Sequence, residues 1–124
     1  MIMRVPHQFA LLAAVLILAG GTVYATQLDI QKEISISRAL AGHVLVWGDQ
    51  PASRVTVELC SSDWKNVLAS TKTDAGGRFS FEPPKRGKLF YIRVSGPGMN
   101  IYELRVRINK HSAQELTIHL SVAT

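Results

Sequence analysis

The chain has 124 residues, a formal net charge of +5 at pH 7 and 47% hydrophobic residues. This length suits one domain with a modest core and is too short for two. The positive charge is mild and no run of Lys and Arg is longer than Lys85-Arg86, which argues against nucleic acid as a partner.

Residues 1–25 have the pattern of a cleavable secretory signal. Arg4 precedes an apolar run over Phe9–Ala19, and small residues lead up to Ala25 at the spacing that signal peptidase accepts. The apolar run is shorter than the roughly 20 residues that a membrane-spanning helix needs. We therefore expect cleavage after Ala25, a periplasmic or secreted protein, and no stable membrane insertion afterwards. The alternative is that the segment is kept as an anchor.

The rest of the chain shows the short alternating segments of a β protein. Residues 26–39 alternate only loosely and are expected to form a tail or an edge strand, with the folded domain over 40–124. About seven strands are expected in that domain, over 42–47, 54–60, 66–71, 79–81, 89–95, 100–108 and 115–122. Turn signals in nearly every gap, and no helical period, predict an all-β, antiparallel Greek-key β-sandwich.

The segment 54–60 alternates most cleanly and shows how the faces are assigned. The apolar positions 55, 57 and 59 are expected in the core, and the positions between them are expected on the solvent side. Cys60, at the end of this segment, is the only cysteine, which excludes an intramolecular disulfide. Its thiol is expected to be half-buried near a strand end; the alternative is an exposed thiol that pairs with another chain.

The most distinctive local pattern is Thr73–Phe81, which reads T-D-A-G-G-R-F-S-F. Here a polar turn leads directly into a strand whose two phenylalanines point to one face. The Asp carboxylate can cap the turn, and each of the two glycines can adopt positive φ at little cost. A later Pro-Gly pair suits the central positions of a type II turn and predicts antiparallel pairing of its flanking strands. The structural turn residues are thus Asp74, Gly76, Gly77, Pro97 and Gly98.

These motifs, in this order, resemble the carboxypeptidase regulatory-like domain. The matching segments are G-H-V-L-V-W, R-V-T-V-E-L, T-D-A-G-G-R-F-S-F, Y-I-R-V-S-G-P-G-M and L-T-I-H-L, which together cover residues 40–122. The most specific piece is the T-D-x-x-G-x-F turn at Thr73–Phe79. The resemblance implies a transthyretin-like (prealbumin-like) sandwich. It also implies an accessory role in folding, spacing or the binding of protein or carbohydrate.

Enzymes that resemble transthyretin in fold carry signatures that this sequence lacks. The chain does not end in the Tyr-Arg-Gly-Ser motif of hydroxyisourate hydrolases, and neither H-E-x-x-H nor G-x-S-x-G occurs. The residues that could supply an iron site, without a recognised ligand spacing, are His43, Tyr91, Tyr102, His111 and His119. We expect no catalytic residue, cofactor or metal; a small hydrolase is the less favoured alternative.

Three arginines are candidates for a binding surface. Arg93, Arg105 and Arg107 take outward positions on neighbouring strands if the alternation holds. In one row they would form a positive stripe whose planar guanidinium groups could bind carboxylates or phosphates. The alternative is a solubilising face on which Glu103 pairs with a neighbouring arginine.

Two tryptophans are the aromatic candidates. Trp47 follows a strand and Trp64 lies in a loop, and either could contact sugar or protein, although a tryptophan in a small domain more often lies in the core or at its rim. The sequence thus predicts an exported, non-catalytic binding or structural module whose partner is a protein or carbohydrate of the cell envelope. A carbohydrate-binding module that uses exposed aromatic residues is the main alternative.

Overall fold

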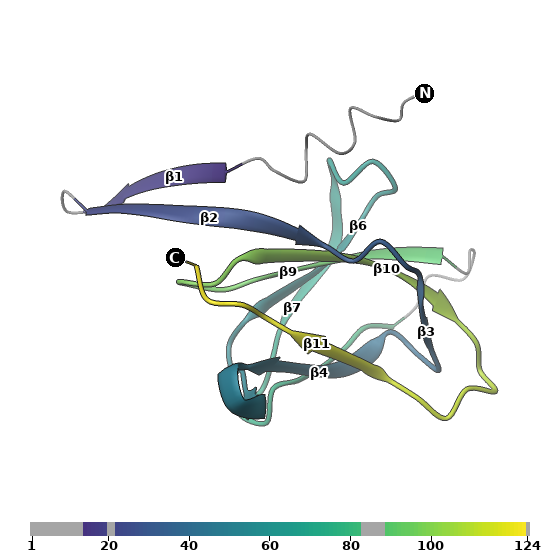
Figure 1. Cartoon of the computed structure of the whole chain (residues 1–124). Coiled ribbons are helices and arrows are strands. Elements are labelled where there is room, and N and C mark those ends of the chain that lie inside the picture. The colour runs from purple at the N-terminus through teal and green to yellow at the C-terminus, as the bar shows by residue number, and fades with distance from the viewer. Residues whose placement is uncertain (1–13, 20–21, 83–88, 124) are drawn as a thin grey trace.

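Each segment with the expected alternation forms a strand. The computed structural model describes residues 14–19, 22–82 and 89–123 (Figure 1). The seven strands expected from the sequence are β4 (Ala41–Val46), β6 (Thr56–Cys60), β7 (Val67–Lys72), β8 (Arg78–Ser80), β9 (Leu89–Ser95), β10 (Ile101–Ile108) and β11 (Leu116–His119). Further elements are β1 (Ala14–Ala19), β2 (Thr22–Ile30), β3 (Ser35–Ser37), β5 (Gln50–Pro51) and the 3-10 turn η1 (Trp47–Asp49).

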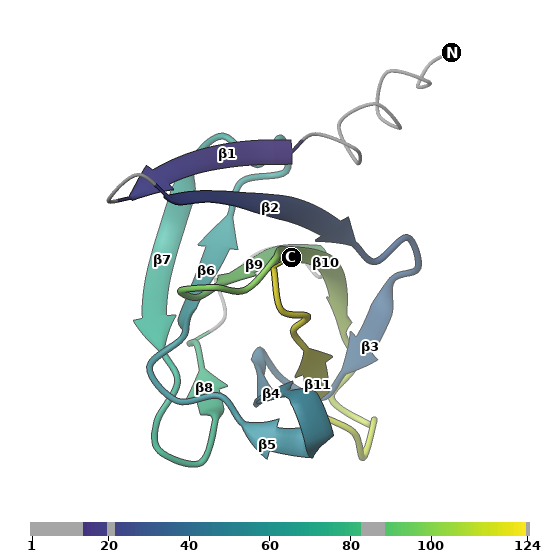
Figure 2. The same ribbon diagram turned by 60° about the vertical axis from the view of Figure 1, so that its left-hand side comes forward.

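The strands form two sheets whose inner faces share one core. The larger sheet has the order β1-β2-β10-β9-β6-β7, with β3 also paired to β10. The smaller sheet has the order β11-β4-β5, with β8 also paired to β4. Figure 2 shows the two sheets on opposite sides of the interior. The core contains Val57, Leu59, Ile92, Val94, Leu104 and Val106 from the larger sheet and Val44, Phe79 and Ile118 from the smaller. The predicted all-β sandwich is confirmed.

Strand direction differs in part from the antiparallel expectation. The pairs β6–β7, β6–β9 and β9–β10 are antiparallel, but β10 pairs in parallel with both β2 and β3, and β11 pairs in parallel with β4. Alternation along a strand tells which face of a sheet a side chain takes. It says nothing about which distant strand becomes the neighbour, so the parallel pairs were not predictable from it.

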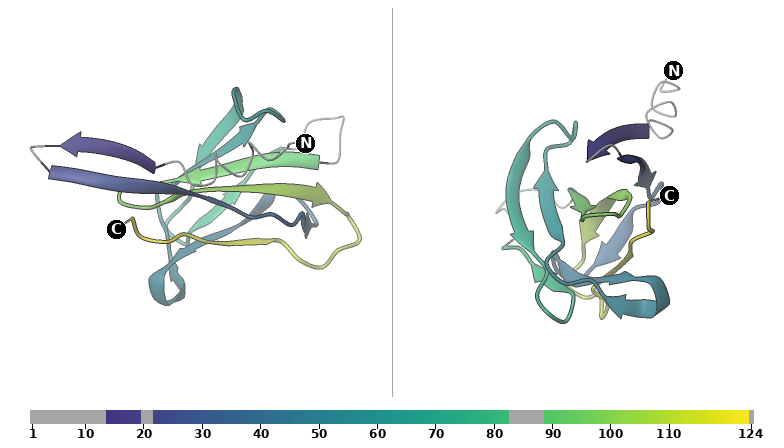
Figure 3. Two further views of the ribbon diagram at one scale, coloured as in Figure 1. Left: turned by 45° about the horizontal axis from the view of Figure 1, so that its top comes forward. Right: turned by 90° about the vertical axis from the view of Figure 1, so that its left-hand side faces the viewer.

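The N-terminal segment lies along β10. β1 and β2 pair antiparallel from Ala19↔Thr22 to Ala14↔Gln27, and Figures 1 and 3 show this hairpin extending away from the rest of the larger sheet. The end of β2, from Leu28, then pairs with β10, and so does β3. The segment 26–39 is therefore an edge strand in two pieces. The expected signal segment includes β1 and the start of β2, and its residues 1–13, 20 and 21 lie outside the described residues.

Two residues are more buried than expected: Glu103, expected on the solvent side, and Cys60, expected to be half-buried. Cys60 is 2% exposed and Glu103 is 5% exposed. Both lie on the face of the larger sheet away from the core, near the charge of Arg93. The loop after β6 folds back on itself through a hydrogen bond from Ser61 N to Asn66 O and covers part of this face. The alternative of an exposed Cys60 thiol that pairs with another chain is therefore wrong.

Candidate functional site

Arg93 lies on the outer face of the larger sheet, and all three nitrogen atoms of its guanidinium group have partners. Its Nε donates to Glu103 Oε2 at 2.9 Å, and its Nη1 lies 3.8 Å from Glu58 Oε1. Its Nη2 donates to the carbonyl oxygen of Trp64 at 2.8 Å. Two carboxylates thus share one guanidinium group, which leaves no surplus positive charge at this point.

The other two candidate arginines do not take part in this cluster. Arg105 is half-buried and donates through Nη2 to the carbonyl oxygen of Lys32, which ties the N-terminal edge segment to β10. Arg107 is exposed. The structure therefore does not bring Arg93, Arg105 and Arg107 together as one free cationic row. The pairing of Glu103 with an arginine, which the alternative expected, is observed with Arg93, but Glu103 is buried and does not belong to a solubilising face.

Trp64 covers the Arg93 cluster. Its ring centroid lies 5.6 Å from Arg93 Cζ, a cation–π arrangement, and 5.4 Å from the ring of Tyr91 in an edge-to-face contact. The backbone at Trp64 has φ of 65°, a left-handed conformation that is unusual for a tryptophan. The adjacent Asp63 supports the turn by accepting the N–H of Lys65, and the pKa of Asp63 is lowered, first by its hydrogen bond from Ser61. Trp64 is thus half-buried against the outer face of the larger sheet, away from the core, so the expectation of a core or core-rim position is wrong for it.

Trp47 has the opposite environment. Its residue surface is 87% exposed, so the expectation of a core or rim position is wrong for this tryptophan. Val44 faces the core on β4, and the same alternation directs Trp47 outward. The chain then turns through Gly48 and Asp49, both with positive φ, and His119 Nε2 lies 3.0 Å from Asp49 Oδ1.

A polar network on the outer face of the smaller sheet was missed by sequence reasoning. Glu115 accepts hydrogen bonds from Arg38 at 2.8 Å and from Arg78 at 3.3 Å. Arg78 also donates through Nη1 to His43 Nε2 at 2.8 Å. Hydrogen bonding by Arg38 is the main cause that lowers the pKa of Glu115. Alternation could indicate only that His43, Arg78 and Thr117 face outward; the strand pairing that puts them side by side is seen only in the structure.

Three of the side chains considered as metal ligands bond to other residues. His43 contacts Arg78, His119 contacts Asp49, and Tyr102 donates its hydroxyl to Gln31 Oε1 at 2.7 Å. Burial raises the pKa of Tyr102. Within the described ranges, no group of three or more His, Cys, Asp or Glu side chains is placed to hold a metal ion.

The turn over Asp74–Arg78 forms around the aspartate. Its Oδ1 accepts the N–H groups of Gly76 and Arg78, each at 2.9 Å. Only one of the two glycines needs its special conformation, because Gly77 has φ of 77° and Gly76 is not among the residues with positive φ. In the second turn, Met99 N donates to Gly96 O and φ of the intervening glycine at 98 is 74°, as a type II turn requires.

Two comparisons with known proteins found no match. A scan against protein-family models finds no match to this chain, and a search of the curated proteins finds none either. In the part of the chain that the structure describes, no helical segment has the length and apolar character needed to cross a membrane.

Proposed function

We propose that the protein is an exported, non-catalytic β-sandwich module that binds a protein or another component of the cell envelope. Trp47 carries the proposal, because it is 87% exposed at the end of β4. Covering a large apolar side chain is worth about 1.5 to 3 kcal/mol, and tryptophan is enriched among the residues that dominate binding energy at interfaces. A partner that covers Trp47 gains this free energy.

The turn that carries Trp47 is closed by backbone pairing at its base. Next to η1, β4 and β5 pair through Leu45↔Pro51 and Val46↔Gln50, and Ala52 N donates to Val44 O at 2.9 Å. An anchor residue on a fixed turn loses little conformational entropy when a partner binds. This arrangement favours a preformed contact point.

The position of the first contacts between the N-terminal segment and the sandwich supports export. Gln27 N donates to Asn100 Oδ1 at 3.0 Å, and Ser121 Oγ donates to Asp29 Oδ2 at 2.8 Å. Cleavage after Ala25 would remove β1 and keep these contacts. The mature chain would then begin where its pairing with the sandwich begins.

The resemblance to carboxypeptidase regulatory-like domains, with their transthyretin-like sandwich, also favours an accessory binding role. Such a domain has no chemistry of its own and acts through contact. The carbohydrate alternative uses the same side chain, since one aromatic ring can stack on the face of a sugar. The protein-binding proposal and the carbohydrate alternative differ in the ligand, but in both of them Trp47 makes the contact.

The test compares three forms of the tagged protein recovered from the envelope of expressing cells. These are the unsubstituted protein, Trp47→Ala, and Leu68→Ala as a matched control, because Leu68 on β7 is also exposed, at 63%. We expect one specific partner with the unsubstituted protein and with Leu68→Ala, lost with Trp47→Ala, and equal melting temperatures for all three. Undiminished capture by Trp47→Ala would refute the proposal. Glycan binding that depends on Trp47, without a protein partner, would favour the carbohydrate alternative.

A further inference from the structure

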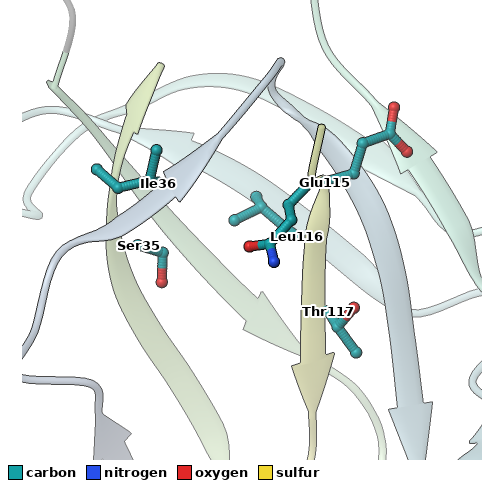
Figure 4. A pocket seen from close by; sticks show the side chains of 6 residues that line it. Ser35, Ile36, Glu115, Leu116 and Thr117 are labelled. Atoms are coloured by element: carbon teal, nitrogen blue, oxygen red, sulfur yellow. The ribbon is translucent and has the colours of Figure 1, made fainter. Parts of the chain in front are cut away.

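A groove opens between β3 of the larger sheet and β11 of the smaller sheet (Figure 4). Its volume is about 520 Å³. Its lining residues are Ser35, Ile36, Gln114, Glu115, Leu116 and Thr117. The groove lies at the start of β11, whereas His119, at the other end of that strand, pairs in register with Leu45 near the Trp47 turn.

One backbone hydrogen bond links the two sides of the groove: Arg38 N, just after β3, donates to Gln114 O, just before β11, at 2.8 Å. On its other side β3 is held to β10, whose pairing continues through the bond from Asn109 N to Ser37 O. Among the described strands, β3 pairs with β10 and β11 pairs with β4, so neither has a strand partner on the side of the groove. A strand edge without a neighbour offers backbone N–H and C=O groups to another extended chain.

The walls of the groove combine apolar and hydroxyl side chains. Ile36 is 46% exposed, and Leu116 is buried beneath the opposite wall. Figure 4 shows Ser35 and Ile36 on one strand and Thr117 on the strand across from it. An extended peptide places successive side chains on opposite faces, so it can set every second residue against the apolar wall.

The surroundings of the groove are basic. Arg38 and Arg78, about half exposed, both bond to Glu115, the one acidic lining residue. Arg107 is exposed and is the cross-strand neighbour of Ile36. Lys110 is exposed in the connection that leads to β11. Glu115 already pairs with two of these four basic side chains, and the presence of Arg107 and Lys110 favours a partner with carboxylates.

We propose that this groove binds an extended acidic segment of a partner protein, which adds as a strand to the free edge of β11. Backbone hydrogen bonds to the strand edge hold the segment, its apolar residues pack on Ile36, and its carboxylates meet Arg107 and Lys110. The inference goes beyond the proposed function, because this surface does not include Trp47.

The test uses the purified full chain and two fluorescent eight-residue peptides, one alternating Val and Glu and one alternating Val and Lys. We expect the Glu peptide to bind at least tenfold more tightly than the Lys peptide, and more weakly as salt is raised. Saturation with the Glu peptide should slow amide hydrogen exchange at least tenfold in β11. No slowing in β11 at saturation would overturn the proposal.

Matched variants connect the binding to the groove. Ile36→Glu and Arg107→Glu should each weaken binding of the Glu peptide at least tenfold, while Leu68→Glu and Lys72→Glu on β7 should leave it within twofold. All four positions are at the surface, so unchanged melting temperatures are expected. Equal binding by all four variants would contradict the assignment.

Two further outcomes separate this inference from its alternatives. Trp47→Ala should leave peptide binding unchanged, so a failure of the groove and a failure of the Trp47 proposal are distinguishable. Protection of β11 that rises with protein concentration without peptide, together with dimers in sedimentation, would show that a second copy of the chain fills the groove. That outcome would also overturn the proposal.

Discussion

Gly77→Ala should be among the most damaging single-methyl changes in the chain. Gly77 has φ of 77°, and a Cβ atom there would lie 2.6 Å from Val44 O and 3.1 Å from Ala52 N. Both atoms belong to backbone that is already hydrogen-bonded, since Val44 N donates to Gly77 O at 2.7 Å and Ala52 N donates to Val44 O at 2.9 Å. The two closest atoms are backbone atoms, and Pro51 Cβ follows at 3.2 Å, so the backbone must move.

The expected cost follows from two contributions. A left-handed conformation costs a residue with a Cβ atom about 1 to 2 kcal/mol. Loss or distortion of the two hydrogen bonds at Val44 adds about 1 to 2 kcal/mol. The free energy of unfolding should therefore fall by about 2 to 4 kcal/mol, which for a domain of this size lowers the melting temperature by roughly 10 to 20 °C.

Gly76→Ala is the matched control, measured by the same thermal denaturation followed by circular dichroism. The nearest atom to its added Cβ is Asp74 Oδ1 at 3.5 Å, an ordinary contact. Without a positive φ to maintain, alanine should be neutral or stabilising by up to about 1 kcal/mol. Equal melting temperatures for Gly76→Ala and Gly77→Ala would refute this account of the turn.

Three other predictions test buried and charged groups. Thr73→Val should lower the free energy of unfolding by about 2 to 4 kcal/mol in urea denaturation, because the Thr73 hydroxyl donates to Ala52 O at 2.5 Å and accepts from Val55 N at 2.9 Å, and both groups would be left buried without it. Burial raises the pKa of Cys60, so its thiol should react with Ellman's reagent far more slowly in the native protein than in urea; equal rates would contradict its burial. The pKa of Glu115 is lowered, so its contribution to stability is present above the ordinary glutamate value and is lost as pH falls through the lowered value; in an NMR titration Arg38→Gln should move that pKa upward, and no movement would contradict the pairing.

Much of the fold could be predicted because alternation reports burial directly. The core positions of β6 and β9 are the apolar ones expected, and the Asp74 turn lies where its glycines indicate. The parallel pairing of β10 with β2 and β3 could not be predicted. It depends on contacts between residues that are far apart in the sequence, such as the hydrogen bond from Tyr102 to Gln31. Only one of the adjacent glycines needs positive φ, a detail fixed by the close approach of β4.

The candidate site was less predictable, because outward side chains were treated as exposed. Arg93 and Glu103 do face away from the core, yet a loop carrying Trp64 covers them. The alternation of apolar and polar residues does not indicate that a loop folds back over a sheet. The exposure of Trp47 could have been predicted from alternation, because Val44 on β4 faces inward and the odd positions must then face outward.

Site-specific photo-crosslinking tests the central claim most directly. A photoreactive amino acid is placed at position 47 or, as the control, at position 68 of the full chain, and intact expressing cells are irradiated before the envelope fraction is analysed. The account predicts one discrete adduct from position 47 and none of that mass from position 68. No adduct from position 47, or the same set of adducts from both positions, would contradict the role of Trp47 as the contact point of an exported binding module.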